Sequence, residues 1–349
     1  MPARLAYFES WVDPVAEQML GAAPEVALQR LRFADPRGDL DAAMAAAHGY
    51  QALPRTELQP PWLCDAGLIA RAPNLLAACS TGAGFDVIDV AACTAAGIIV
   101  CHQSGTNKEA VAEHALGLML ALSKKMMPAD RAMRRSAGLD RYAMTGNDIL
   151  GKTVGLIGIG AIGTRVAELC RGLFRMEVLA CDPHLDAATI TARGARKVTM
   201  EELLARADFV SVHCPRDATT LGLIGAAEFA RMKQTAFFIQ TARGGIHDEA
   251  ALAAALAEGR IAGAGVDVFL KEPPPPDHPL LAFDNVIATP HIAGITQEAL
   301  HEMARAAAEQ WIAIFRGEVP PRLVNPEAWP AYSARFARAF NRAPDSLPA

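Results

Sequence analysis

The chain has 349 residues, of which 52% are hydrophobic, and its formal net charge at pH 7 is −5. This length is typical of about two domains that each bury a core, and the mild charge without a Lys/Arg cluster argues against a nucleic-acid partner. No segment has the pattern of a signal peptide or a membrane span, so we expect a cytoplasmic protein, with no membrane partner, that binds a small molecule.

The seven cysteines are an odd number, scattered through mostly apolar runs, which predicts reduced thiols and no disulfides. Two adjacent pairs, Cys101–His102 and His213–Cys214, could suggest a nucleophile or metal ligands. However, neighbours on a strand point to opposite faces, and neither pair has a CxxC or HxxxH companion. We interpret them as core thiols and loop histidines and expect no metal site.

The first hundred residues alternate between short apolar runs and helix-like segments. Helical periodicity is read at residues 26–31, 39–47 and 65–70. Residues 75–86 (LLAACSTGAGFD) predict a buried strand that ends in a glycine loop, and IIVCHQSGTN predicts another strand and loop. Residues 108–125 then predict a helix whose apolar positions nearly surround it, as in a helix buried along much of its length.

After a charged connector at residues 126–148, the sequence VGLIGIGAIGTRVAELCRGL predicts a strand, a glycine turn and a helix in succession. Gly158, Gly160 and Gly163 have the G-x-G-x-x-G spacing, in which the glycines serve a tight turn, close approach to a pyrophosphate and helix packing. The phosphates would lie at the helix N-terminus. By itself the spacing also fits a purely structural turn.

The next strand, residues 176–183, ends in Asp182, which lies 19 positions after Gly163 (182 − 163). An acidic residue about 20 positions on is placed to bind the ribose hydroxyls of NAD. The turn and the acid together favour a dinucleotide site.

Helices at 200–207, 226–232 and 248–258 alternate with strands in DFVSVHCP, AFFIQTARG, IAGAGVDVF and NVIATPHIAG. This order predicts an α/β fold with a parallel sheet and a ligand at the C-terminal strand ends. We expect a stiff loop without regular structure at residues 271–279, and disorder in the last ~25 residues from their Pro, Arg and Ala content.

Polar residues fall where the predicted strands end, namely Arg243, Asp267, Glu272 and His291. An arginine fork can hold a carboxylate and polarise the adjacent carbonyl, and a histidine can move an alcohol proton near neutral pH. A carboxylate beside the histidine favours its charged form and orients the ring. Singly, each residue also fits a solvated surface group, but together they suit hydride transfer to or from a small oxo acid.

The motifs STGAGFDVID, NKEAVAEHALGLMLAL, GLIGIGAIG, VSVHCP, TARGG, GVDVF with KEP, and HIAG follow in one order between Leu75 and Asn325. In this order the chain resembles the NAD-dependent D-isomer-specific 2-hydroxyacid dehydrogenases, which include hydroxypyruvate, glyoxylate and phosphoglycerate dehydrogenases. The resemblance implies two Rossmann/flavodoxin-like domains, each a doubly wound parallel sheet, with the substrate in the cleft between them. Residues 1–105 plus 293–349 would form the substrate domain and residues 106–292 the NAD domain. Family members are commonly homodimers, which makes residues 126–148 a candidate arm.

The resemblance implies that Arg243, Glu272 and His291 are the catalytic trio and that NAD is the cofactor. The implied substrate contacts are Thr81, Gly82, Ala83, Gly84, Arg243 and His291. The implied cofactor contacts are Thr106, Gly158, Gly160, Ala161, Ile162, Gly163, Asp182, His213, Cys214, Pro215, Thr219, Thr241, Ala242, Arg243, Asp267, His291 and Gly294.

Two segments depart from the family pattern: the Pro-rich stretch 53–64 and the tail beyond Asn325. Two alternatives remain open beside a 2-hydroxyacid dehydrogenase. The trio could support oxidation of another small anion such as phosphite. The fold could also serve an NAD-sensing scaffold or co-regulator without turnover.

Overall fold

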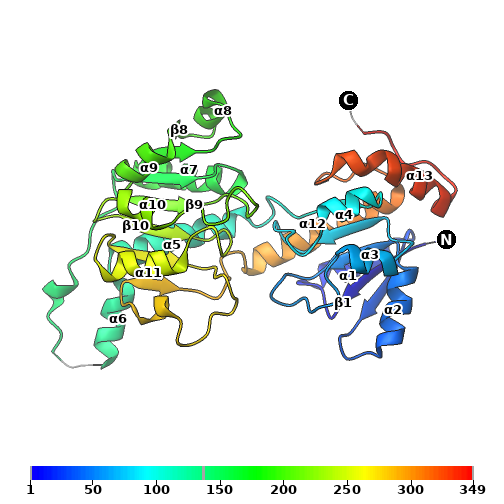
Figure 1. Ribbon diagram of the computed structural model, residues 1–349, viewed down its shortest axis with the longest axis horizontal. Coiled ribbons are helices and arrows are strands. Elements are labelled where there is room, and N and C mark those ends of the chain that lie inside the picture. Colours follow the sequence, from blue (N-terminus) through cyan, green and yellow to red (C-terminus); the bar gives the residue numbers. More distant parts are fainter. Residues whose placement is uncertain (1, 136–137, 348–349) are drawn as a thin grey trace. The chain divides into compact units, whose positions relative to one another are not determined.

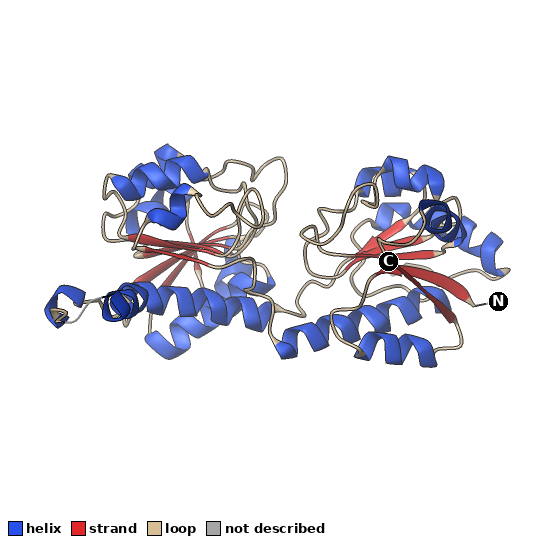
Figure 2. Cartoon of the chain, turned by 90° about the horizontal axis from the view of Figure 1, so that it is seen from below, coloured by secondary structure: helices blue, strands red, loops and turns tan. Residues whose placement is uncertain are grey.

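The computed structural model describes residues 2–135 and 138–347; residues 1, 136–137 and 348–349 lie outside the described part. The chain divides into two compact units. Unit 1 comprises Met1–Asn107 with Gln297–Ala349, and unit 2 comprises Lys108–Thr296. Each unit has a parallel β-sheet between two layers of helices (Figures 1 and 2), which confirms the predicted α/β fold.

Unit 1 has a five-stranded sheet in the order β2-β1-β3-β4-β5. This 2-1-3-4-5 order is that of flavodoxin-like sheets, in which ligands bind beyond the C-terminal strand ends. The strands are β1 Ala3–Phe8, β2 Val26–Leu31, β3 Gly49–Ala52, β4 Ala77–Ser80 and β5 Ile99–Cys101. The helices are α1 Val15–Ala22, α2 Arg37–Ala46, α3 Ala66–Arg71, α4 Val90–Ala95, α12 Gln297–Arg316 and α13 Trp329–Phe340, with a 3₁₀ turn η3 at Pro326–Ala328.

The two faces of the unit 1 sheet are covered by different parts of the chain, because successive strand residues point to opposite sides. One face packs Phe8, Tyr50 and Val100 into a core with α2, α3 and α4. The other packs Leu5 and Ile99 against side chains of α1, α12 and α13. The C-terminal helices, orange and red in Figure 1, are therefore an integral layer of this unit.

Two expectations for unit 1 are wrong. Residues 26–31 form a strand, β2, which pairs along its whole length with β1. Six residues with mixed apolar spacing fit either structure, and pairing with a neighbouring strand decides between them. The tail is not disordered, because α13 buries Trp329, Tyr332 and Phe336 against the sheet; residues 348–349 of the tail lie outside the described part.

Unit 2 has a seven-stranded parallel sheet in the order β12-β11-β10-β9-β6-β7-β8. Its first strand, β6, is internal, and the chain winds outward on both sides of it, as in a Rossmann sheet. The strands are β6 Thr153–Ile157, β7 Glu177–Cys181, β8 Arg196–Lys197, β9 Phe209–Val212, β10 Phe237–Gln240, β11 Gly263–Val266 and β12 Val286–Ala288. The helices are α5 Lys108–Ser123, α6 Met126–Arg135, α7 Ala161–Phe174, α8 Ala187–Ala192, α9 Met200–Arg206, α10 Ala226–Arg231 and α11 Glu249–Ala257, with 3₁₀ turns η1 Arg141–Met144 and η2 Pro279–Ala282.

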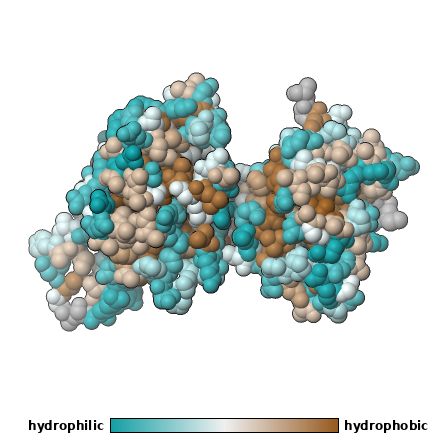
Figure 3. Space-filling model, viewed as in Figure 1, coloured by the Kyte–Doolittle hydropathy of each residue, from teal (hydrophilic) through white to brown (hydrophobic). Residues whose placement is uncertain are grey.

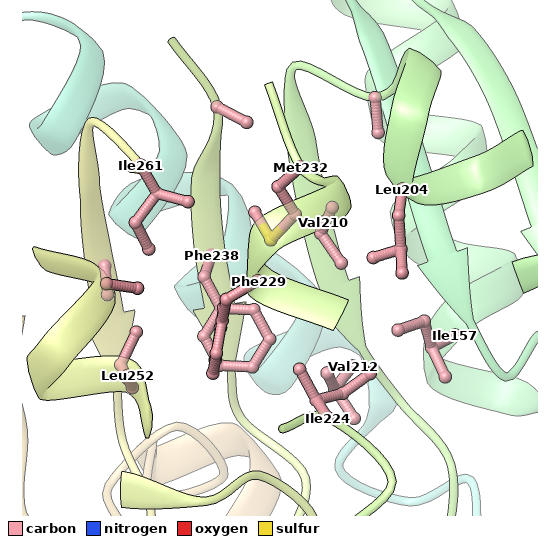
Figure 4. Packing of buried hydrophobic residues seen from close by; sticks show 14 of the residues in the cluster. Ile157, Leu204, Val210, Val212, Ile224, Phe229, Met232, Phe238, Leu252 and Ile261 are labelled. Carbon is pink, nitrogen blue, oxygen red and sulfur yellow. The ribbon is translucent and has the colours of Figure 1, made fainter. Parts of the chain in front are cut away.

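Unit 2 also has a core on each sheet face. Figure 4 shows the one in which Phe229 of α10 meets Phe238 of β10, with ring centroids 5.2 Å apart in an edge-to-face arrangement. On the opposite face, α5 buries Ala112, Leu118 and Met119, so the predicted buried helix is confirmed. These two layers hold the strands whose C-terminal ends carry the candidate site.

The segment expected to be a connector, residues 126–148, contains the helix α6 and the turn η1, and its residues 136–137 lie outside the described part. No residue of α6 is buried, and Met126, Met127 and Met133 are exposed. Figure 3 shows exposed apolar residues among hydrophilic ones on both units. Within the described ranges, no helix is long and apolar enough to cross a membrane.

Candidate active site

The glycine turn joins β6 to α7, as predicted from the sequence. Gly158 has a φ of +87°, and a Cβ there would lie 2.8 Å from the backbone nitrogen of Cys214. A Cβ at Gly163 would lie 2.5 Å from the carbonyl oxygen of Gly158, so both positions require glycine. At Gly160, the N-cap of α7, a Cβ would meet nothing within 4 Å. The turn thus leaves open space at a helix N-terminus, where unpaired N–H groups favour anions.

Asp182, just after β7, is brought to this turn. Its Oδ2 accepts a hydrogen bond from the backbone N–H of Ile159, at 3.2 Å, and its Oδ1 accepts one from that of His184, at 3.0 Å. Arg193 also reaches the turn and donates to the carbonyl of Ile159, at 2.5 Å. The acid expected for the ribose therefore lies beside the glycine turn, and the sequence reasoning missed Arg193.

His213, Cys214 and Pro215 follow β9, whose strand lies next to β6. His213 Nε2 lies 2.8 Å from Ser211 Oγ, and burial lowers the pKa of His213 to about 4. Burial raises the pKa of Cys214 to about 11. Burial thus disfavours the charged form of both side chains.

The predicted trio lies in loops after β10, β11 and β12. His291 Nδ1 is 2.9 Å from Glu272 Oε2, and Glu272 Oε1 accepts a hydrogen bond from the backbone N–H of Phe269, at 3.0 Å. Arg243 donates to the carbonyl of Ala242, at 2.8 Å. Burial raises the pKa of Glu272, but the hydrogen bond and charge of His291, the Phe269 N–H and the charge of Arg243 outweigh it and leave this pKa below its ordinary value.

Asp267 is fully buried and holds the loop that carries His291. Its Oδ1 accepts hydrogen bonds from Thr289 Oγ1, at 2.6 Å, and from the backbone N–H of Ile292, at 2.9 Å; its Oδ2 accepts one from the N–H of Ala293, at 2.9 Å. His291 itself has a φ of +57° and donates its N–H to the carbonyl of Asp267, at 2.7 Å. The carboxylate and the backbone carbonyl of Asp267 therefore hold this loop in place. They stabilise a positive φ at His291, a conformation that residues other than glycine rarely adopt.

Two further polar groups in this region were not predicted. His114 of α5 has its Nε2 3.2 Å from Thr289 Oγ1 and 3.8 Å from Asp267 Oδ1. Gln240, fully buried at the end of β10, accepts a hydrogen bond from the N–H of Ala242, at 2.9 Å. The sequence signal for the contact between Gln240 and Ala242 was a polar glutamine at the end of the apolar run FFIQ.

The remaining predicted residues have these positions. Thr219 Oγ1 donates to Asp217 Oδ1, at 2.6 Å, within the loop after β9. Thr241 Oγ1 is buried and has no hydrogen-bond partner among the described residues. Ala161 and Ile162 begin α7, and Gly294 follows the Asp267-bound loop. Among the described residues, no three His, Cys, Asp or Glu side chains are grouped as metal ligands.

The predicted substrate loop, residues 81–84, and Thr106 belong to unit 1. Thr81 Oγ1 donates to the carbonyl of Ala52, at 2.9 Å. The carbonyl of Gly82 accepts two hydrogen bonds, from Ser80 Oγ at 2.9 Å and from the backbone N–H of Gln103 at 2.8 Å. The loop is thus fastened to the ends of β3, β4 and β5.

The unit 2 residues fit a dinucleotide. The open space at Gly160 fits a pyrophosphate, and Asp182 beside the turn fits a ribose. The buried hydroxyl of Thr241, which has no partner among the described residues, fits a polar group of the cofactor. With polar residues at the same strand ends, this sheet defines a nicotinamide-dependent oxidoreductase as the class of protein.

Comparison with known proteins identifies the family. The family described as "D-isomer specific 2-hydroxyacid dehydrogenase, NAD binding domain" matches residues 116–293. A glyoxylate reductase of Thermofilum pendens is 41% identical over 268 residues, which cover 75% of this chain and 78% of that protein. The chain belongs to the D-isomer-specific 2-hydroxyacid dehydrogenase family, an NAD-dependent family of oxidoreductases, and the predicted resemblance is confirmed.

Two other relatives extend the comparison. A D-3-phosphoglycerate dehydrogenase of Archaeoglobus fulgidus is 42% identical over 253 residues, which cover 72% of this chain but only 48% of that longer protein. The crystal structure of a D-lactate dehydrogenase of Aquifex aeolicus, complexed with NAD and lactic acid, has a TM-score of 0.78 and 25% identity, and the match covers 92% of this chain and 98% of that one. The similarity therefore includes both units.

Proposed function

We propose that this protein transfers a hydride between NAD(H) and a small D-2-hydroxy acid or the corresponding 2-oxo acid. The observation that carries the proposal is the His291–Glu272 pair, with 2.9 Å between Nδ1 and Oε2, on a loop held by buried Asp267. The glycine turn, Asp182 and Thr241 of unit 2 bind the cofactor, together with the other family positions named above, of which Thr106 belongs to unit 1. The substrate is bound by the loop at residues 81–84 of unit 1 and by Arg243 and His291 of unit 2.

When bound, NADH supplies the hydride that reduces the carbonyl carbon. His291 delivers the proton to the carbonyl oxygen from Nε2, because Nδ1 is engaged by Glu272. Glu272 orients the ring, and the lowered pKa of Glu272 keeps this carboxylate ionised for that task. Arg243 binds the substrate carboxylate and stabilises negative charge on the carbonyl oxygen. In the oxidative direction His291 removes the hydroxyl proton.

The loop at residues 81–84 binds the substrate carboxylate with backbone N–H groups. Both hydrogen bonds to the carbonyl of Gly82 lie on one side of the Gly82–Ala83 peptide. In a trans peptide the N–H of Ala83 is directed to the opposite side. The loop therefore offers a fixed donor to an anion.

The test is NADH consumption by the purified protein with glyoxylate, hydroxypyruvate, pyruvate and longer 2-oxo acids. Turnover of at least one acid, with formation of the D-hydroxy product, supports the proposal. Tight binding of NADH without turnover of any acid would contradict it and favour a sensing scaffold. Phosphite-dependent reduction of NAD alone would favour the small-anion alternative.

We further propose a homodimer in which α6 contacts a second copy. Met126, Met127 and Met133 are exposed apolar side chains on an otherwise polar helix without buried residues, and a second copy would cover them. Light scattering after size-exclusion chromatography tests this, with M126E/M133E expected to give a monomer. A cytoplasmic location is supported by the free thiols of all seven cysteines, which suit a reducing compartment.

A further inference from the structure

Gln103 differs from the other buried amide side chains described in unit 1 because both of its amide atoms lack a partner. The residue is fully buried, and neither Oε1 nor Nε2 has a hydrogen-bond partner among the described residues. A primary amide offers two donors and an acceptor, and burying them without partners is unfavourable. Such an amide requires a hydrogen-bond partner from outside the chain, either a ligand or an ordered water.

Two other buried amides of this unit have partners at both ends, and a third has a partner at one end. Gln51 accepts a hydrogen bond from Trp311 Nε1, at 2.7 Å, and donates to Thr81 Oγ1, at 3.3 Å. Asn325 accepts from the N–H of Val100, at 2.7 Å, and donates to two oxygens. Gln310 donates from Nε2 to Cys79 Sγ, at 3.9 Å, while its Oε1 has no partner among the described residues.

The position of Gln103 connects it to the candidate substrate loop. It follows β5, the parallel neighbour of β4, so both loops leave the same C-terminal edge of the sheet. Its backbone N–H donates to the carbonyl of Gly82, and its own carbonyl accepts from Thr106 Oγ1, at 2.6 Å. The Gln103 backbone is therefore fixed directly beside the peptide whose N–H is offered to a carboxylate.

We propose that Gln103 is a specificity-determining residue, whose amide hydrogen-bonds a hydroxyl on the carbon next to the reacting carbonyl. A neutral hydroxyl both donates and accepts, as does the amide, and it would lie a short distance from a carboxylate on the loop. The preferred substrates are then 3-hydroxy-2-oxo acids, such as hydroxypyruvate, over glyoxylate and pyruvate, which lack this hydroxyl. This inference rests on the proposed function and narrows it.

The experiment measures kcat/KM for NADH-dependent reduction of hydroxypyruvate, pyruvate and glyoxylate by the wild type, Q103L and Q310L. The wild type is expected to prefer hydroxypyruvate over pyruvate. Q103L is expected to reduce kcat/KM for hydroxypyruvate by roughly 10- to 100-fold, mainly through KM, and to change the other two little, because only the hydroxyl loses its partner. Q310L is the matched control, since it removes a buried amide of the same unit away from the loop, and it should change all three substrates alike.

Equal losses on all three substrates with Q103L would overturn the inference and assign Gln103 a structural role or an ordered water. A wild type without preference for hydroxypyruvate over pyruvate would overturn it as well. Thermal unfolding identifies a folding defect in Q103L; in that case Q103M, which keeps the length of the side chain without a hydrogen-bonding group or a charge, should lose activity selectively on hydroxypyruvate. Absence of NADH oxidation with every acid would instead reject the proposed function itself.

Discussion

His291 Nδ1 and Glu272 Oε2 lie 2.9 Å apart, although the two residues are 19 positions apart in the chain. Glu272 follows β11 and His291 follows β12, two adjacent parallel strands, so their C-terminal ends bring the two loops together. This contact leaves Nε2 as the ring nitrogen available to a substrate. The pair is accordingly the first target for mutation.

Replacing His291 by alanine should reduce kcat by about 100-fold or more, because a positioned acid–base group is lost. NADH binding, followed by the fluorescence of the reduced nicotinamide, should persist. H301A is a suitable control, since this exposed histidine pairs with Asp13 in unit 1. Unchanged turnover of H291A would remove the residue from the mechanism.

The lowered pKa of Glu272 predicts a pH-dependent contribution to stability. A carboxyl whose pKa is lower in the folded than in the unfolded state stabilises the fold above its ordinary pKa, and this contribution is lost as the pH falls through the lower, folded value. The E272Q variant should therefore unfold at lower urea than wild type at neutral pH, and the difference should shrink below pH 4.5. The exposed E327Q should show no such trend. A difference that is constant over this range would argue against the His291 contact.

Asp267 makes a prediction about the loop rather than about acid–base chemistry. In D267N, one carboxylate oxygen becomes an NH₂ group that faces a backbone N–H of Ile292 or Ala293. The buried clash of donors should destabilise the protein by about 3 kcal/mol and lower kcat through the displaced His291. Chemical denaturation with paired kinetic measurements tests both. If D267N had the stability and activity of the wild type, Asp267 would not be what holds the His291 loop in place.

The glycine turn offers a matched pair of substitutions. G163A places a Cβ 2.5 Å from the carbonyl of Gly158 and should destabilise the fold by about 1–3 kcal/mol. G160A meets nothing within 4 Å, so its stability should match wild type, while its NADH affinity should fall about tenfold because the pyrophosphate needs that space. Equal NADH affinity in G160A and wild type would place the phosphates elsewhere.

Asp182 should determine cofactor choice. D182A removes a charged acceptor for the ribose hydroxyls and should weaken NADH binding roughly tenfold. It also removes the repulsion of a 2′-phosphate, so NADPH binding should weaken less or improve. Parallel fluorescence titrations with the two cofactors give the ratio of affinities. A parallel loss for both would mean that Asp182 only holds the turn through Ile159.

The glycine turn, Asp182 and the order of strands and helices in unit 2 could be predicted because each depends on local spacing. The hydrogen bonds around Asp267 could not be predicted. Their donors are backbone N–H groups about two dozen residues later, and the direction of these groups depends on a φ of +57° at His291. Helix α6 was missed because a helix without buried residues lacks a core-facing pattern. In the tail, by contrast, Trp329, Tyr332 and Phe336 do recur at helical spacing. The prediction of disorder gave more weight to the Pro, Arg and Ala content than to this spacing.

The layer that α12 and α13 form on unit 1 has a consequence for biosynthesis. Until those helices leave the ribosome, the residues up to Asn107 have one sheet face without Trp311, Phe315, Tyr332 and Phe336 to cover it. Residues 108–296 are complete earlier and contain both of their own cores. Residues 108–296 can therefore fold before the N-terminal residues have the helices that complete their core. During that interval the exposed sheet face is a natural site for chaperones.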